Sequence, residues 1–164
     1  MDLNSLFHWL QDTDLATAIR EGDVLFPWIE TVHVLAIVLV VGSISIVDLR
    51  LLGWASRDRP VSQVMHDVLP LTWGAFAVAV IAGSLLFSSK AVDYAHSFFF
   101  LGKMVLLVLA GINMVIFHAF SGRDIARWSK AADTPLPAKI AAGASLTLWI
   151  AVVAFGRWIG FTLH

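Results

Sequence analysis

The sequence predicts an all-α membrane protein: a four-helix transmembrane bundle with an N-terminal amphipathic interfacial segment. Three observations support this prediction. Hydrophobic residues make up 59% of the chain and charged residues only 14%, whereas a soluble domain is about a quarter charged. Four mostly apolar stretches of about 20 residues or more are each long enough to cross a bilayer. The length of 164 residues suits one bundle and not two domains.

Composition also excludes several classes of function. The formal net charge of −1 offers no basic surface for nucleic acid, so no nucleic-acid partner is expected. The absence of cysteine excludes disulfides, zinc ribbons, iron–sulfur clusters and thiol catalysis. Histidine, methionine and carboxylates remain as ligands for haem, copper or iron. The chain has no phosphate-binding glycine loop, Gly-x-Ser-x-Gly or His-Glu-x-x-His motif, so these enzyme classes are not indicated. A non-enzymatic protein is favoured, and an enzyme of another class stays the alternative.

Residues 1–25 are expected to form one or two short amphipathic helices on the periplasmic side of the membrane. Apolar residues recur at helical spacing in both halves, while acidic residues make the segment too polar to span. Thr13 is placed to cap the second helix and Gly22 to end it. The early Asp2 and the lack of a basic region do not fit a cleavable signal peptide. The alternative role for the segment is a docking helix for a partner.

The transmembrane domain is expected over residues 26–164, with spans at about 27–52, 68–89, 98–120 and 138–162. The connection between the second and third spans is short, which makes these two spans antiparallel neighbours. The loops on the other side of the membrane are longer and more polar.

Basic residues indicate the orientation of the spans. Seven of them flank the loops on one side and two lie on the other, which predicts cytoplasmic loops and outside termini. The expected location is the bacterial inner membrane, with the lipid bilayer around the bundle. The seven are Arg50, Arg57, Arg59, Arg123, Arg127, Lys130 and Lys139, and the two are Arg20 and Lys90.

Small residues recur every four positions on two spans. They are Ala75, Ala79 and Gly83 on the second span, and Gly156 and Gly160 on the fourth. Small side chains at this spacing let membrane helices approach closely. Helix packing is therefore the main interpretation, and room for a flat cofactor is the alternative.

The ionisable residues inside the spans are expected to form an outer layer and an inner layer. The outer layer contains Glu30 and His33 from span 1, Lys103 from span 3 and Arg157 from span 4. Charges at this depth cost roughly 3 kcal/mol each unless paired or solvated, so these side chains should face one another. Glu30 can neutralise only one cation, which leaves a site for a haem propionate, a quinone oxygen or a small carboxylate. A buried ion-pair cluster that only stabilises the bundle is the alternative.

The inner layer contains Asp48 of span 1, His66 at the start of span 2, and Asn113, Met114 and His118 of span 3. Met114 precedes His118 by one turn on the same helix face. The alternative interpretation of His66 is a solvated loop histidine. For His118 it is a helix-end histidine bonded to a carbonyl group or to Asp48.

Two cofactors fit this distribution of ligands. Haem b in a membrane bundle needs two histidines at one depth, and His33 pairs in depth with His96 as His66 does with His118. The best-placed haem ligands are His33 and His118, with Lys103 and Arg157 beside the propionates. Copper, held by histidine and methionine, is the weaker alternative. The secondary candidates for metal ligation are His66, His96 and Met114.

Seven short stretches, spread over essentially the whole chain, form a fairly specific set. They are Phe26–Ala36, Val47–Gly53, Leu69–Trp73, Phe98–Lys103, Ala110–Asn113, Phe117–His118 and Gly156–Ile159. The chain thereby resembles an uncharacterised family of small four-span bacterial inner-membrane proteins, a domain of unknown function. This resemblance implies the fold and the location. More remotely, the chain is similar to the copper-resistance D membrane proteins and the cytochromes b561. Those cytochromes have more spans and four buried histidines, where this chain has two well-placed ones.

Three functional hypotheses follow. The first is a non-enzymatic membrane subunit that docks a periplasmic protein through residues 1–25 and the outer polar layer. The second is a b-type haem electron-transfer protein. The third is a copper-handling membrane protein.

Overall fold

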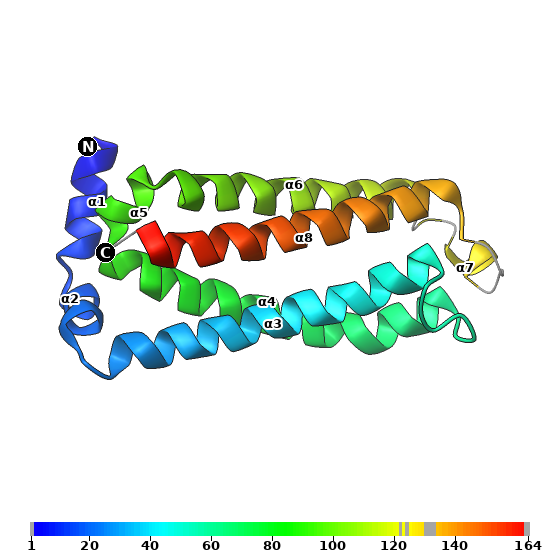
Figure 1. Cartoon of the computed structure of the whole chain (residues 1–164), viewed down its shortest axis with the longest axis horizontal. Coiled ribbons are helices and arrows are strands. Elements are labelled where there is room, and N and C mark those ends of the chain that lie inside the picture. The colour runs from blue at the N-terminus through cyan, green and yellow to red at the C-terminus, as the bar shows by residue number, and fades with distance from the viewer. Residues whose placement is uncertain (1, 122, 124, 130–133, 163–164) are drawn as a thin grey trace.

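The computed structural model describes residues 2–121, 123, 125–129 and 134–162, and in these ranges the chain is helical without strands. Four long helices run side by side, and two short ones, α1 and α2, lie across one end of them (Figure 1). We call this the α1 end and the opposite one the α7 end. The helices are α1 (Leu3–Gln11), α2 (Asp14–Glu21), α3 (Leu25–Leu52), α4 (Val61–Ser89), α5 (Ala91–His96), α6 (Phe98–Phe120), α7 (Ile125–Trp128) and α8 (Leu136–Thr162).

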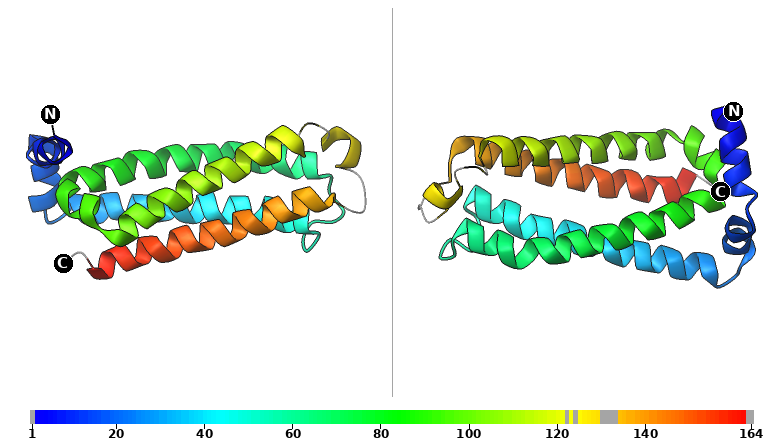
Figure 2. Two further views of the ribbon diagram at one scale, coloured as in Figure 1. Left: turned by 90° about the horizontal axis from the view of Figure 1, so that it is seen from above. Right: turned by 180° about the vertical axis from the view of Figure 1, so that it is seen from behind.

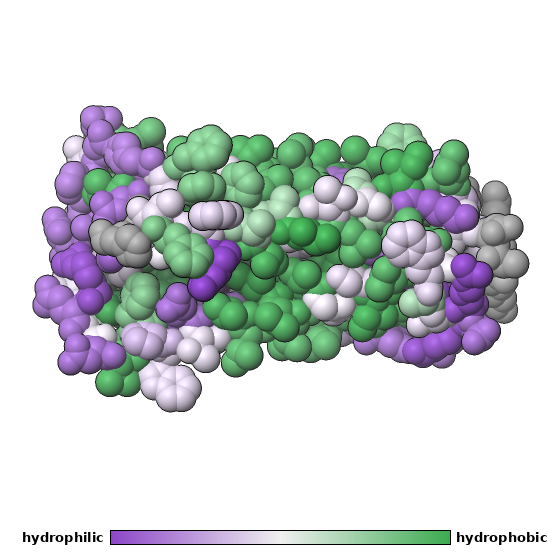
Figure 3. All heavy atoms as spheres, viewed as in Figure 1, coloured by the Kyte–Doolittle hydropathy of each residue, from purple (hydrophilic) through white to green (hydrophobic). Residues whose placement is uncertain are grey.

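The helices α3, α4, α6 and α8 are each long and apolar enough to cross a membrane. The protein is therefore a multi-pass membrane protein, and the predicted all-α bundle is confirmed. Apolar side chains cover the middle of the molecule, while polar side chains gather at both ends (Figure 3). Many large apolar residues of the long helices are exposed, as expected for surfaces that face lipid tails.

The four long helices form an open arrangement. Helix α3 packs against α4 and α8, and α6 packs against α8. Helices α4 and α6, both described along their whole length, make no close backbone contact with each other. The short helix α5 connects them at the α1 end (Figure 2).

The α7 end contains the main apolar core. Side chains from all four long helices contribute to it, and Leu52, Met65, Val68, Ile125, Trp128 and Ala141 pack around it. Its buried members are Val47, Leu51, Val61, Val64, Phe117, Ala138 and Ala142.

At the α1 end, helix α2 is fastened to the bundle. Thr13 caps α2 by accepting a hydrogen bond from the Ala16 backbone N–H, as predicted. Ala16 and Ile19 are fully buried. The guanidinium of Arg20 donates to the carbonyl oxygens of Gln11, 3.2 Å away, and Ser89, 3.4 Å away.

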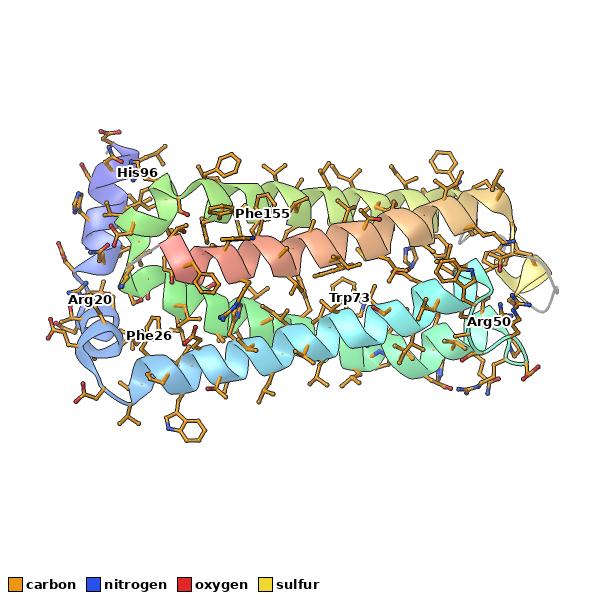
Figure 4. All side chains as sticks on the ribbon, in the orientation of Figure 1. Arg20, Phe26, Arg50, Trp73, His96 and Phe155 are labelled. Carbon is orange, nitrogen blue, oxygen red and sulfur yellow. The ribbon has the colours of Figure 1, made fainter. Side chains whose placement is uncertain are left out.

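Helix α1 is held by a second connection, because Gln11 Oε1 accepts from the backbone N–H of Val92 at 3.1 Å. Arg20 and His96 lie at this end and Arg50 at the other (Figure 4). Residues 3–21 are therefore a docked part of the fold and not a loose tail.

Candidate functional site

The candidate site lies between the long helices toward the α1 end, and all four of them contribute to it. His33 comes from α3, Gly83 from α4, Lys103 from α6 and Gly156 from α8. Both polar side chains belong to the predicted outer layer. Both glycines belong to the stripes of small residues on the second and fourth spans.

The ring of His33 is fixed by α4. Its Nδ1 lies 2.9 Å from the carbonyl oxygen of Ala79. A carbonyl oxygen can only accept a hydrogen bond, so Nδ1 carries the proton and donates it. A Cβ atom added at Gly83 would stand 2.8 Å from His33 Cε1, which is too close for two carbon atoms. Gly83 therefore leaves the room that the ring occupies.

Lys103 lies in the same region and is partly buried. Its Nζ is 3.5 Å from the position that a Cβ on Gly156 would take, so the side chain is turned toward α8. Both side chains lie toward the α1 end, where the positive charge of Lys103 contributes to the electrostatic environment of His33. Among the residues that the structure describes, no carboxylate lies within ion-pair distance of Lys103.

The other two expected members of the outer layer lie differently. Glu30 and Arg157 are both exposed. The guanidinium carbon of Arg157 stands 4.6 Å from the centre of the Phe161 ring, one turn further along α8. The structure thus places His33 and Lys103 in the same region of the bundle and does not join Glu30 and Arg157 to them in a buried cluster.

Glu30 instead acts on Tyr94 of α5. Burial raises the pKa of the Tyr94 phenol, and the negative charges of Glu30 and Asp93 raise it further. The ring of Phe87 stacks on that of Phe100 at 5.2 Å between centroids, and Tyr94 packs against both. This aromatic cluster, which the sequence analysis did not identify, joins α4, α5 and α6 beside the site.

The residues of the predicted inner layer are dispersed. Asn113 donates to the carbonyl oxygen of Ala141 at 3.0 Å, which links α6 to α8. Asp48 is 5% exposed and lies near Ser145, and its Oδ2 has no hydrogen-bond partner within the described ranges. The side chain of His66 is 89% exposed and lies 3.6 Å from Asp67.

The predicted haem and copper ligands are far from one another. His33 is near the start of α3, whereas His118 is near the end of α6, at the α7 end. His118 and His96 are exposed, and the Nδ1 of each bonds a carbonyl oxygen of its own helix, that of Met114 and Val92 respectively. In the described part of the chain, no three His or carboxylate side chains gather at one point. His33 and His118 cannot serve as two axial ligands of a single iron.

The family described as "Family of unknown function (DUF6644)" matches residues 6–162. The chain belongs to this family. No curated protein and no solved structure matches the chain significantly, so the remoter likeness to copper-resistance D proteins and cytochromes b561 stays a prediction. The family match covers all four spans and most of α1. Because the family has no assigned function, the function has to be argued from the residues of this chain.

Proposed function

We propose that the protein is a non-enzymatic subunit of the bacterial inner membrane that docks a periplasmic partner with a basic surface at its α1 end. The supporting observation is that α1 and α2 are held to the bundle and display exposed acidic side chains. We call this surface the acidic platform. It consists of Asp2, Asp12, Asp14, Glu21, Asp23, Glu30 and Asp93, all of which are exposed.

The platform has a rigid support. Ile19 is 1% exposed, and Ser89 and Ala91, at the end of α4 and the start of α5, are fully buried beneath the short helices. A surface that is already ordered loses little conformational entropy when a partner binds. The short helices therefore suit docking better than a flexible acidic tail would.

The seven acidic side chains of the platform outnumber the basic side chains at the same end, which are Arg20, Lys90, Lys103 and Arg157. Arg20 is 3.9 Å from Glu21 but also donates to two backbone carbonyls, which directs it inward. A surface with an excess of one sign attracts partners of the opposite sign and accelerates their association. A partner with a basic surface is therefore the expected occupant.

The charge pattern of the loops supports a periplasmic position for the platform. The basic residues in and beside the two connections at the α7 end outnumber those at the α1 end. The positive-inside rule places such loops in the cytoplasm. Both the start of α1 and the end of α8 lie at the α1 end and would face out (Figure 1).

A photo-crosslinking amino acid at position 14 in living cells tests the docking proposal. We expect a discrete protein crosslink that weakens when Asp12 and Glu21 are both changed to lysine, because the platform then attracts basic surfaces less. The matched control is the crosslinker at position 58, since Asp58 is an exposed acid at the α7 end. The proposal would be contradicted if the yield of the crosslink at position 14 did not change on charge reversal, or if position 14 crosslinked only to lipid.

Haem b is the second candidate, and one observation favours it. The hydrogen bond from His33 Nδ1 to a carbonyl leaves Nε2 as the free ring nitrogen, as in histidines that bind metals. The ligand on the other side would have to come from a residue other than His118. A visible spectrum of the dithionite-reduced protein, expressed with ample haem, tests this candidate: sharp α and β bands that disappear in His33→Ala support it, and a colourless protein removes it.

A further inference from the structure

Lys103 is an unusual cation for a membrane-spanning helix. It is the sixth residue of α6, so its Cα lies roughly 8 Å below the start of the helix. Lysines near helix ends normally extend toward the membrane surface, which avoids burying the charge. Here the ammonium group instead points across to Gly156 on α8. Within the described ranges it has no ion-pair partner, so a charged donor group is left with unused hydrogen-bonding capacity.

His33 supplies a second polar group within electrostatic range of this ammonium. Ala79 and Gly83 of α4 fix its ring, and Nδ1 is occupied by the bond to Ala79. Only Nε2 remains for a ligand, and it accepts a hydrogen bond when the ring is neutral and donates one when the ring is protonated. The fixed ring therefore offers one free nitrogen in the region of the ammonium group.

The surroundings of this pair are apolar and adjoin the bilayer. The aromatic cluster of Phe87, Tyr94 and Phe100 lies between α4 and α6 at the same end of the bundle. Helices α4 and α6 make no close backbone contact, and Lys103 keeps part of its surface exposed. Because Lys103 is partly exposed on a membrane-spanning helix, a ligand dissolved in the membrane can reach it from the lipid side.

We propose that Lys103 and His33 bind the carboxylate of a lipid-soluble molecule, such as a long-chain fatty acid. One fixed positive charge matches one negative charge, and an ammonium–carboxylate hydrogen bond is among the stronger polar contacts in proteins. A carboxylic acid enters hydrocarbon in its protonated form, whereas the phosphodiester of a phospholipid stays charged and remains at the surface. The depth of Lys103 therefore favours a carboxylate over a phospholipid headgroup.

Native mass spectrometry of the full chain in detergent, titrated with oleate, tests this proposal. We expect one oleate per protein, and about tenfold weaker binding in Lys103→Gln. The matched control is Lys90→Gln, which removes the same charge at the same end of the bundle but outside the site, and should bind within twofold of the wild type. Methyl oleate has the same chain without the charge and should not bind.

Two further binding measurements, with acetate and with the Glu30→Gln variant, identify the source of the carboxylate and the role of Glu30. Acetate that displaces oleate at similar concentrations would show a water-soluble ligand and overturn the proposal. If the wild type does not bind oleate but Glu30→Gln does, Glu30 forms an ion pair with the ammonium group of Lys103. This result would also overturn the proposal. So would equal binding by wild type and Lys103→Gln. If Lys103→Gln does not fold, Lys103→Arg should retain binding and Gly83→Ala, which displaces the His33 ring, should weaken it.

Discussion

The two ends of the bundle differ in how they are built. At the α7 end, buried apolar side chains from all four long helices pack into one cluster. There the Nε of Arg50, itself buried, donates to the carbonyl oxygen of Arg59 at 2.8 Å. At the α1 end, the helices meet through glycines, aromatic rings and the docked α1 and α2, while Lys103 lacks an ion-pair partner within the described ranges. From this comparison we propose that stability is concentrated at the α7 end and that binding takes place at the α1 end.

The sharpest test of this division uses two leucines of α3. Leu51 is 3% exposed in the core of the α7 end, whereas Leu35 is 59% exposed toward lipid. We expect Leu51→Ala to lower the free energy of unfolding by about 3 kcal/mol, because it leaves a cavity. Leu35→Ala should change it by less than about 0.5 kcal/mol. Unfolding in mixed micelles, followed by circular dichroism, measures both, and equal losses would show that Leu51 is not packed in a core at the α7 end.

The second test asks how firmly the acidic platform is attached. Ile19→Ala should weaken the docking of α2 by about 2 kcal/mol, since Ile19 is buried against the bundle. Leu15→Ala, on the exposed face of the same helix, should have little effect. Amide hydrogen exchange across residues 3–21 should become about 30-fold faster in the first variant only. Fast exchange in the wild type would mean that the platform is not held as described.

The third test concerns two glycines of α4. A Cβ at Gly83 would collide with the His33 ring, whereas one at Gly74 would meet nothing within 4 Å. We expect Gly83→Ala to cost about 1–2 kcal/mol and to displace the ring from Ala79. Gly74→Ala should be neutral or slightly stabilising. Histidine NMR signals and thermal unfolding distinguish the two, and an unchanged His33 signal in Gly83→Ala would count against the described packing.

The smallest effect is expected at Asp48, a polar exception at the α7 end. Its buried carboxylate has an oxygen without a partner in the described part of the chain. Removing a poorly compensated buried carboxylate should be stabilising, so Asp48→Asn should raise the free energy of unfolding by about 1 kcal/mol. The exposed Asp58→Asn serves as the control. A loss of stability in Asp48→Asn would show that its Oδ2 is compensated after all.

The sequence allowed the helices to be predicted better than the site. Helix α6 begins and ends at Phe98 and Phe120, where hydropathy placed the third span, but α4 begins at Val61 instead of near residue 68. Hydropathy identifies the part of a helix that lies in lipid. The first turns of α4 are polar, so hydropathy did not assign them to the second span. Capping by Thr13 was also predictable, because it depends on local sequence alone.

The contacts of the site depended on information that one sequence does not contain. Depth along each helix follows from residue number, which is why His33 and Lys103 were expected on one level. Which way a side chain points depends on how the helices rotate against each other, and this is set by packing at residues such as Gly83. For this reason the exposed positions of Glu30 and Arg157 were not anticipated.

Our central claim is that the acidic platform faces the periplasm, where it binds a partner. Cysteine labelling tests the position of the platform most directly. The chain has no cysteine, so Asp14→Cys and Asp58→Cys each introduce a single reactive thiol, one at either end. A membrane-impermeant maleimide is applied to cells whose outer membrane has been opened. Our account predicts rapid labelling at position 14 and labelling at position 58 only after the inner membrane is permeabilised. The reverse pattern would place the platform in the cytoplasm and contradict the account.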